Sequence, residues 1–274
     1  MRGASRWFAA LALAILPAAC ATAPGKTAPP AYLLLGEVHD NADGHARRLA
    51  DLTALVDAGW RPALVMEQFD RDRAADLAQA MQSCPDADCV ISRAGGARWQ
   101  WAYYKPLIAL ALKHQLPLIA GNVSRAEAGQ VMRAGMVSVF TPAEQAAFGL
   151  PGALSPELLA AQMQAVNEGH CGSAPADMLP GFATAQAARD LWMAEAMLTH
   201  AGHGVVLIAG NGHVRPDWGV PYWLRLRGVT DFRVVSYVEQ TGPADAAGQG
   251  EVRVVKPQPR PDPCASLTPA GGKG

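Results

Sequence analysis

The stretch YLLLGEVHDN, residues 32–41, decides the fold class. Four apolar residues end at Gly36, and Glu37, His39, Asp40 and Asn41 follow at once. An unbroken apolar run of this kind is typical of a strand that is buried on both faces of a parallel sheet. The polar residues therefore mark the carboxyl end of such a strand, which is where ligands bind in open parallel sheets.

The same pattern repeats along the chain, and helical patterns lie between the apolar runs. Further strands are expected in PALVMEQF (62–69), LPLIAGNV (116–123), GVVLIAGNGHV (204–214), FRVVSYVEQ (232–240) and EVRVVKP (251–257). Helices are expected over 45–60, 70–83 and 99–115, with Pro106 as a first-turn residue or a kink. Residues 125–200 contain three more helical patterns and no strand. This order predicts an α/β fold with a mainly parallel sheet, covered on both faces, and an α-helical insert of about residues 125–200.

The length and composition fit one well-buried domain, because the chain has 274 residues, of which half are hydrophobic. The net charge is −1 and no basic cluster indicates nucleic-acid binding. At the N-terminus, two arginines precede the apolar run 7–16, which is too short to span a bilayer. Ala18 and Ala19 then precede Cys20. We interpret residues 1–19 as a lipoprotein signal peptide and 20–31 as a lipidated Cys20 with its tether; a plain signal peptide is the alternative, since Pro17 stands where leucine is usual.

Four cysteines remain in what would be an exported chain, where disulfides form. Four cysteines allow three pairings. Cys84 with Cys89 is the expected pair, because CPDADC resembles a tight polar loop. Cys171 with Cys264 would then tie down the tail. A metal knuckle at Cys84 and Cys89 is disfavoured, because the chain has no second pair with that spacing.

Polar residues follow four of the predicted strands and should meet at one edge of the sheet. Glu37, His39, Glu67 and His213 are the candidates for chemistry, and three interpretations stay open. They could bind a divalent metal, a carboxylate could orient a histidine that acts as a general base on water, or they could form a structural network. Asp40 and Asn41 are expected to cap the next helix.

Several motifs together resemble the ChaN family, which comprises haem-binding bacterial lipoproteins of the erythromycin esterase/Tiki superfamily. They are LLLGEVHDN, VMEQF, WQWAYYKPLIALALKHQLPLIAGNVSR, HCG, AQAARDLWMA and LIAGNGHVRPDWGVP. The resemblance covers residues 32 to about 240, and 241–274 would add a C-terminal strand and a Pro/Gly-rich tail. It implies a three-layer α/β/α sandwich that binds haem (haem b) at the outer membrane during iron acquisition. It also implies a homodimer, a tyrosine iron ligand and an outer-membrane haem receptor as a partner.

The resemblance points to particular residues for the haem. Tyr104 occupies the family's tyrosine-x-proline place and is the first choice as iron ligand, since tyrosinate binds haem iron. Tyr103, Trp101, His170 and Arg125 are further candidates for the haem site. The ordinary alternative for either tyrosine is a core ring with its hydroxyl at the surface.

A second function stays open beside haem binding. Glu37, His39 and His213 could serve a metal-dependent hydrolase or peptidase of the erythromycin esterase/Tiki type. Asp40 follows the G-E-x-H motif where the esterase branch has glycine, which favours the ChaN side. Enzymatic activity is therefore not favoured, and a purely structural envelope lipoprotein ranks last.

Overall fold

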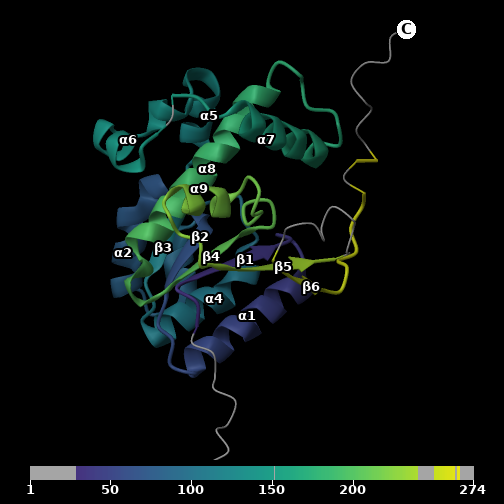
Figure 1. The fold of residues 1–274 in the computed structure, drawn as a ribbon. Helices are drawn as coiled ribbons and strands as arrows, with labels where there is room; N and C mark the ends of the chain where they lie inside the picture. Colours follow the sequence, from purple (N-terminus) through teal and green to yellow (C-terminus); the bar gives the residue numbers. More distant parts are fainter. Residues whose placement is uncertain (1–28, 151, 240–249, 263, 266–274) are drawn as a thin grey trace, which may run out of the picture.

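The strands form one sheet in which every neighbouring pair is parallel. The computed structural model describes residues 29–150, 152–239, 250–262 and 264–265. The sheet order is β3-β2-β4-β1-β5-β6, and Figure 1 shows helices on both faces. The predicted α/β fold with a parallel sheet is confirmed. The strands are β1 Tyr32–Glu37, β2 Ala63–Asp70, β3 Leu118–Asn122, β4 Val205–Gly210, β5 Arg233–Val238 and β6 Glu251–Val254.

The helices follow the predicted order, with additions that the sequence pattern did not reveal. Pro106 lies inside α4, which continues past it without ending. The stretch expected to be a cysteine loop also begins α3, where the Asp86 side chain accepts a hydrogen bond from the Cys89 N–H at 2.9 Å. The α-helices are α1 Ala42–Asp57, α2 Ala74–Ser83, α3 Ala87–Ala94, α4 Trp101–His114, α5 Arg125–Ala134, α6 Pro142–Phe148, α7 Pro156–Gly169, α8 Leu179–Thr199 and α9 Val220–Leu226.

Alternate residues of the buried strands supply two separate cores. In β1, Leu33 and Leu35 face the core shared with α1 to α4, and Leu34 faces the core shared with α8 and α9. All three are at most 3% exposed. Because successive side chains of a strand point to opposite faces, a run of leucines fills both cores at once. This arrangement is the predicted three-layer sandwich.

The position of β4 brings the functional strand ends together. β4 lies between β2 and β1, so the carboxyl ends of these three strands are adjacent. In the register of β1 and β4, Glu37 lies opposite Gly210. A Cβ atom on Gly36 would lie 2.4 Å from Asn211 Oδ1 and 2.5 Å from Val214 Cγ2. Only glycine therefore allows the segment after β4 to pack against β1 here.

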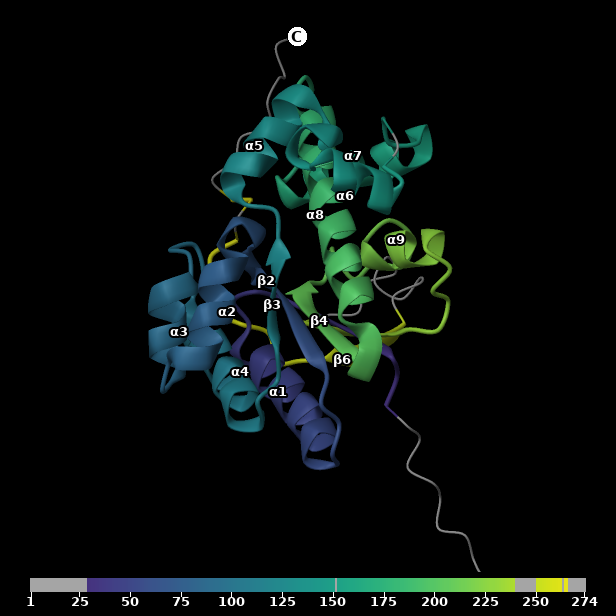
Figure 2. The same ribbon diagram turned by 90° about the vertical axis from the view of Figure 1, so that its left-hand side faces the viewer.

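The predicted insert lies beyond the strand ends, and its last helix is shared with the sheet. Figure 2 shows α5, α6 and α7 together at one end of the molecule, with α8 running from them down to the sheet. At its upper end α8 packs closely on α5, because a Cβ on Gly181 would lie 3.2 Å from the Met132 carbonyl oxygen. Further down, Trp192 Nε1 donates to the Ala120 carbonyl at 3.0 Å. Residues 125–200 thus contain the crossover helix as well as the insert.

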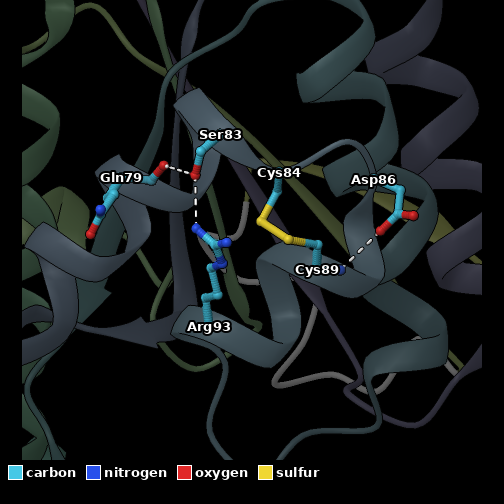
Figure 3. Close-up of a disulfide and its surroundings, with 6 residues drawn as sticks. All are labelled: Gln79, Ser83, Cys84, Asp86, Cys89 and Arg93. Carbon is cyan, nitrogen blue, oxygen red and sulfur yellow. Dashed lines mark hydrogen bonds between the residues drawn. A yellow bond between two sulfur atoms is a disulfide. The ribbon is translucent and has the colours of Figure 1, made fainter.

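Two disulfides match the expected pairing. Cys84–Cys89 joins α2 to α3, and Figure 3 shows Arg93 beside it, donating to Ser83 at 2.8 Å. Cys171–Cys264 joins residues that are 93 positions apart. The first disulfide closes a local loop, whereas the second fixes the C-terminal tail to the end of α7.

The two residues expected to cap α1 have different roles. Asn41 is the N-cap and accepts from the Gly44 N–H at 2.6 Å, as predicted. Asp40 does not cap the helix; instead Arg260 donates to both of its carboxylate oxygens at 2.7 Å. The sequence could not indicate this partner, because it lies 220 positions away.

The predicted signal peptide and Cys20 lie outside the described residues. In the part of the chain that the structure does describe, no helix combines the length and apolar character needed to cross a membrane.

Candidate functional site at the carboxyl ends of the strands

The strand-end site comprises Glu37, His39, Glu67 and His213 with the side chains that touch them. The backbone brings them together: Glu37 ends β1, Glu67 lies near the end of β2, and His213 follows β4. The Gly210 N–H donates to Glu67 Oε2 at 2.8 Å, which ties β4 to β2 beyond their ladder. The four residues predicted to converge thus lie in one cluster.

Glu37 is the most heavily bonded residue of the cluster. It is 3% exposed and forms an ion pair with Arg48. The Tyr104 hydroxyl donates to its Oε1 at 2.5 Å, and His39 Nδ1 lies 2.9 Å from the same oxygen. Gln68 Nε2 adds a weaker contact at 3.4 Å. Because the charge is buried, these partners are what make an ionised Glu37 tolerable.

A histidine and an arginine of α1 support Glu37 from below. Arg48 is 1% exposed, and burial lowers its pKa to about 10. His45 Nε2 donates to the His39 carbonyl at 2.9 Å, so Nδ1 is free to accept from Arg48 Nη2 at 2.9 Å. Burial lowers the pKa of His45, which suits this neutral tautomer. The two residues are one turn apart on a single helix face, so one helix orients both.

His213 is held as a cation between two carboxylates. Its Nδ1 lies 2.5 Å from Asp190 Oδ1, and its Nε2 lies 3.5 Å from Glu67 Oε1. Burial opposes the charge, but Glu67 and Asp190 together raise the pKa of His213 to about 10. For the same reason the pKa of Glu67 falls to about 2 despite its burial. Burial wins at Asp190, whose pKa is raised. A histidine that holds its proton at neutral pH cannot accept one from water.

His39 is the accessible member of the cluster, with a side chain that is 46% exposed. Its Nδ1 bonds Glu37, and its Nε2 lies 3.9 Å from Glu67 Oε2. Trp99 contacts the ring edge-on, with centroids 5.1 Å apart. A Cβ on Gly210 would lie 2.8 Å from Nε2, so glycine there makes room for the imidazole. A histidine oriented by a carboxylate is the usual arrangement of a general base.

The arrangement does not favour the predicted divalent metal. Glu37, His39, Glu67 and His213 bond one another and their neighbours. Across the ranges that the structure describes, no group of three or more His, Cys, Asp or Glu side chains is placed to hold a metal ion.

The predicted iron ligand Tyr104 belongs to this same cluster. Its side chain is fully buried, with the hydroxyl directed at Glu37 and not at the surface. Burial raises its pKa, although Arg48 opposes the rise. Tyr103, on the same turn of α4, is half-buried and stacks on His45 with centroids 4.7 Å apart. Trp101 is half-buried and donates to the Gly96 carbonyl at 2.7 Å. The tyrosines and the strand ends therefore form one region, where the sequence allowed two.

The other two haem candidates lie elsewhere. Arg125 is exposed at the first position of α5. His170 is exposed at the end of α7, where its Nδ1 donates to the Val166 carbonyl at 2.7 Å and its ring stacks on Phe182. That bond leaves Nε2 with its lone pair free, which is the tautomer of a metal ligand. Among the described residues, no hydrogen bond or ring contact joins His170 to the strand-end site.

A family model decides the relationship of the chain to known proteins. The model described as haem-binding uptake, Tiki superfamily, ChaN, matches residues 25–224. The chain belongs to the ChaN family. The match includes every strand-end residue and both α4 tyrosines. The proposed relationship from the sequence motifs is thereby confirmed.

Solved structures give the same fold. ChaN of Campylobacter jejuni, solved for its cofacial haem binding, superposes with a TM-score of 0.69 at 17% identity, covering 83% of this chain and 88% of that one. The type III effector HopBA1 gives a TM-score of 0.44 at 10% identity, covering 82% and 88% of the two chains. An erythromycin esterase gives 0.40 at 15%, covering 83% and 76%. No curated protein sequence matches the chain.

Sequence reasoning missed three residues of this ChaN-family site. Arg48 and His45 follow the capped start of α1 at a three-residue spacing, and a buried arginine beside G-E-x-H could have been suspected from that spacing. Asp190 lies in an otherwise apolar helix and is 0% exposed. A lone acid in such a helix indicates a buried partner, but the sequence does not reveal that the partner is His213.

Proposed function

We propose that this protein binds haem as a lipid-anchored protein of the outer membrane and acts in haem and iron acquisition. The observation that carries the proposal is the match of a haem-binding family model to residues 25–224. The Ala-Ala-Cys sequence ending at Cys20 supports the anchor. A homodimer and an outer-membrane haem receptor are the expected partners.

The residues of α4 differ in how well they fit a haem iron. Tyr104 fits poorly as arranged, because its oxygen is buried and bonded to Glu37. Tyr103 is half-buried, so a modest displacement would bring its ring to the surface. We therefore propose Tyr103 as the tyrosine ligand, with His170 as the second candidate because its Nε2 is free. Haem, when bound, would supply the iron centre, and the chain would supply the axial oxygen or nitrogen.

A haemin titration tests the proposal. The protein lacking residues 1–20 should give a saturable Soret shift that is lost in Tyr103→Phe and retained in the matched variant Tyr104→Phe. His170→Ala, with the exposed His203→Ala as its control, tests the second ligand. No Soret shift in the unsubstituted protein would refute haem binding. Loss in Tyr104→Phe alone would show that α4 rearranges to present the buried tyrosine.

Hydrolysis is the second candidate function, and one observation favours it. His39 is exposed and its Nδ1 is paired with Glu37, so it could take a proton from water. An ester substrate with a chromogenic leaving group should then be cleaved by the unsubstituted protein and by Tyr103→Phe, but not by His39→Ala or Glu37→Gln. Equal background rates in all four proteins would exclude this function.

A further inference from the structure

The C-terminal tail, residues 255–264, runs from β6 across the loop that carries His39. Its main chain is bound at the start: the Val255 N–H donates to the Val238 carbonyl at 2.8 Å, and the Lys256 N–H donates to Asp43 at 2.8 Å. Asn41 Nδ2 donates to the Lys256 carbonyl at 2.8 Å. The tail is thus attached to the first turn of α1, next to the strand-end site.

Arg260 makes the central attachment. It donates to both oxygens of Asp40 at 2.7 Å and to the two oxygens of Glu239 at 2.7 and 2.8 Å. The bond from Arg260 is the main reason that the pKa of Glu239 falls to about 2. Glu239 also accepts from Asn41 Nδ2 at 2.5 Å. One guanidinium therefore joins the residue after His39 to the end of β5, in the geometry that makes Arg–carboxylate pairs strong and directional.

The far end of the tail is covalently fixed to the insert. Cys264 is bonded to Cys171, immediately after α7, and the Cys264 N–H donates to Asp262 at 2.8 Å. Figure 1 shows the yellow tail rising from β6 toward the loop that follows α7. The tail therefore links three parts that are separate in sequence: the His39 loop, the edge of the sheet and the helical insert.

We infer that residues 255–264 form a strap that holds the His39 loop and the insert in place and so limits access to the strand-end site. The strap lies beyond residues 25–224, to which the ChaN family model matches, so it is an addition to that core. Arg260 is a positioning residue: it touches Asp40, and Asp40 is covalently next to the exposed His39. The inference deepens the proposed function, because it takes the strand-end site as the functional one.

Two attachments can be removed separately, and each has a matched control in the chain. Arg260→Gln removes the ion pairs, with Arg233→Gln as control because Arg233 pairs with the exposed Glu251. Cys171→Ser/Cys264→Ser removes the covalent end, with Cys84→Ser/Cys89→Ser as control. The readout is hydrogen exchange of the full chain without haem. Exchange reports local opening separately from global unfolding.

The strap predicts faster exchange over residues 36–45 in both strap variants, about fivefold for Arg260→Gln, and over 156–182 in the cysteine variant. A factor of five is what an ion-pair network of about 1 kcal/mol would give. Arg260→Lys should recover part of the protection, since lysine restores the charge but not the fork. Unchanged exchange in these segments, or equal changes in the control variants, would overturn the strap.

Haemin association separates this inference from the proposed function. Strap variants should bind haemin at least severalfold faster than the unsubstituted protein. Faster exchange with no haemin binding in any variant would refute haem binding and leave the strap as a structural fact about the His39 loop. Faster exchange with an unchanged association rate would refute control of access.

Discussion

Replacing His213 by glutamine should cost about 3–5 kcal/mol of unfolding free energy at neutral pH. His213 has a side chain that is 13% exposed, and it lies between Asp190 and Glu67 at 2.5 and 3.5 Å. Glutamine keeps much of the size and hydrogen-bonding capacity but removes the positive charge. Glu67 would then remain buried without its cation, and an unpaired buried charge costs this amount. The rise in the pKa of His213 from 6.5 to about 10 corresponds to about 5 kcal/mol, which agrees.

The pH dependence gives the prediction its sign. Because the folded pKa of His213 is raised, its contribution is complete below about pH 6.5 and is lost as the pH rises through about 10. The pKa of Glu67 is lowered from 4.5 to about 2, so its contribution is complete above about pH 4.5 and is lost as the pH falls through about 2. The difference between the unsubstituted protein and His213→Gln should therefore be greatest between pH 4.5 and 6.5.

Urea denaturation between pH 3 and 9, analysed by linear extrapolation, measures the difference. His203→Gln is the control, because His203 is exposed and should change stability by less than about 0.5 kcal/mol. A double-mutant cycle with Glu67→Gln should show positive coupling between the two sites. A loss below about 1 kcal/mol in His213→Gln, or a loss that does not vary with pH, would refute the description of His213 as a buried cation.

The remaining predictions concern packing, the tyrosine and the disulfides. Gly36→Ala should lose about 1–3 kcal/mol in the same urea assay, because its Cβ would collide with Asn211 and Val214, while Gly96→Ala has open space and should be neutral; equal effects would contradict the packing argument. Tyr104→Phe should lose about 1.5–3 kcal/mol, since a hydrogen bond to the buried Glu37 is removed, and an unchanged midpoint would count against that bond. Removing Cys171–Cys264, with its separation of 93 residues, should cost about 4–5 kcal/mol, against about 2 kcal/mol for Cys84–Cys89, with a separation of 5; a larger loss for the short loop would reverse the expectation.

The strands and their polar ends were predictable because each has a local signature. A run such as LLLG followed by Glu37 shows both the buried strand and its end within a few residues. The same holds for Asn41, whose capping role depends on the residues that follow it. Short elements such as α3 and α9 have weaker periodicity, and their formation depends on packing that the sequence pattern does not contain.

The contacts that define the site were harder to predict because they are not local. Tyr104 was expected to face the surface, yet its hydroxyl reaches Glu37, which lies 67 positions earlier. Arg260 and Asp40 are 220 positions apart. Such pairs depend on the sheet order and on the path of the tail, and neither property leaves a periodic trace in the sequence.

Helix α8 has a mechanical consequence for the site. One rigid rod contacts α5 at Gly181, carries Asp190 to His213 and is fixed to β3 through Trp192. A load applied to the insert is therefore transmitted along the rod to the imidazolium, where a small tilt would change the hydrogen-bond length and with it the proton affinity of His213. The insert would act as a lever whose displacement is recorded as a change in charge at the sheet.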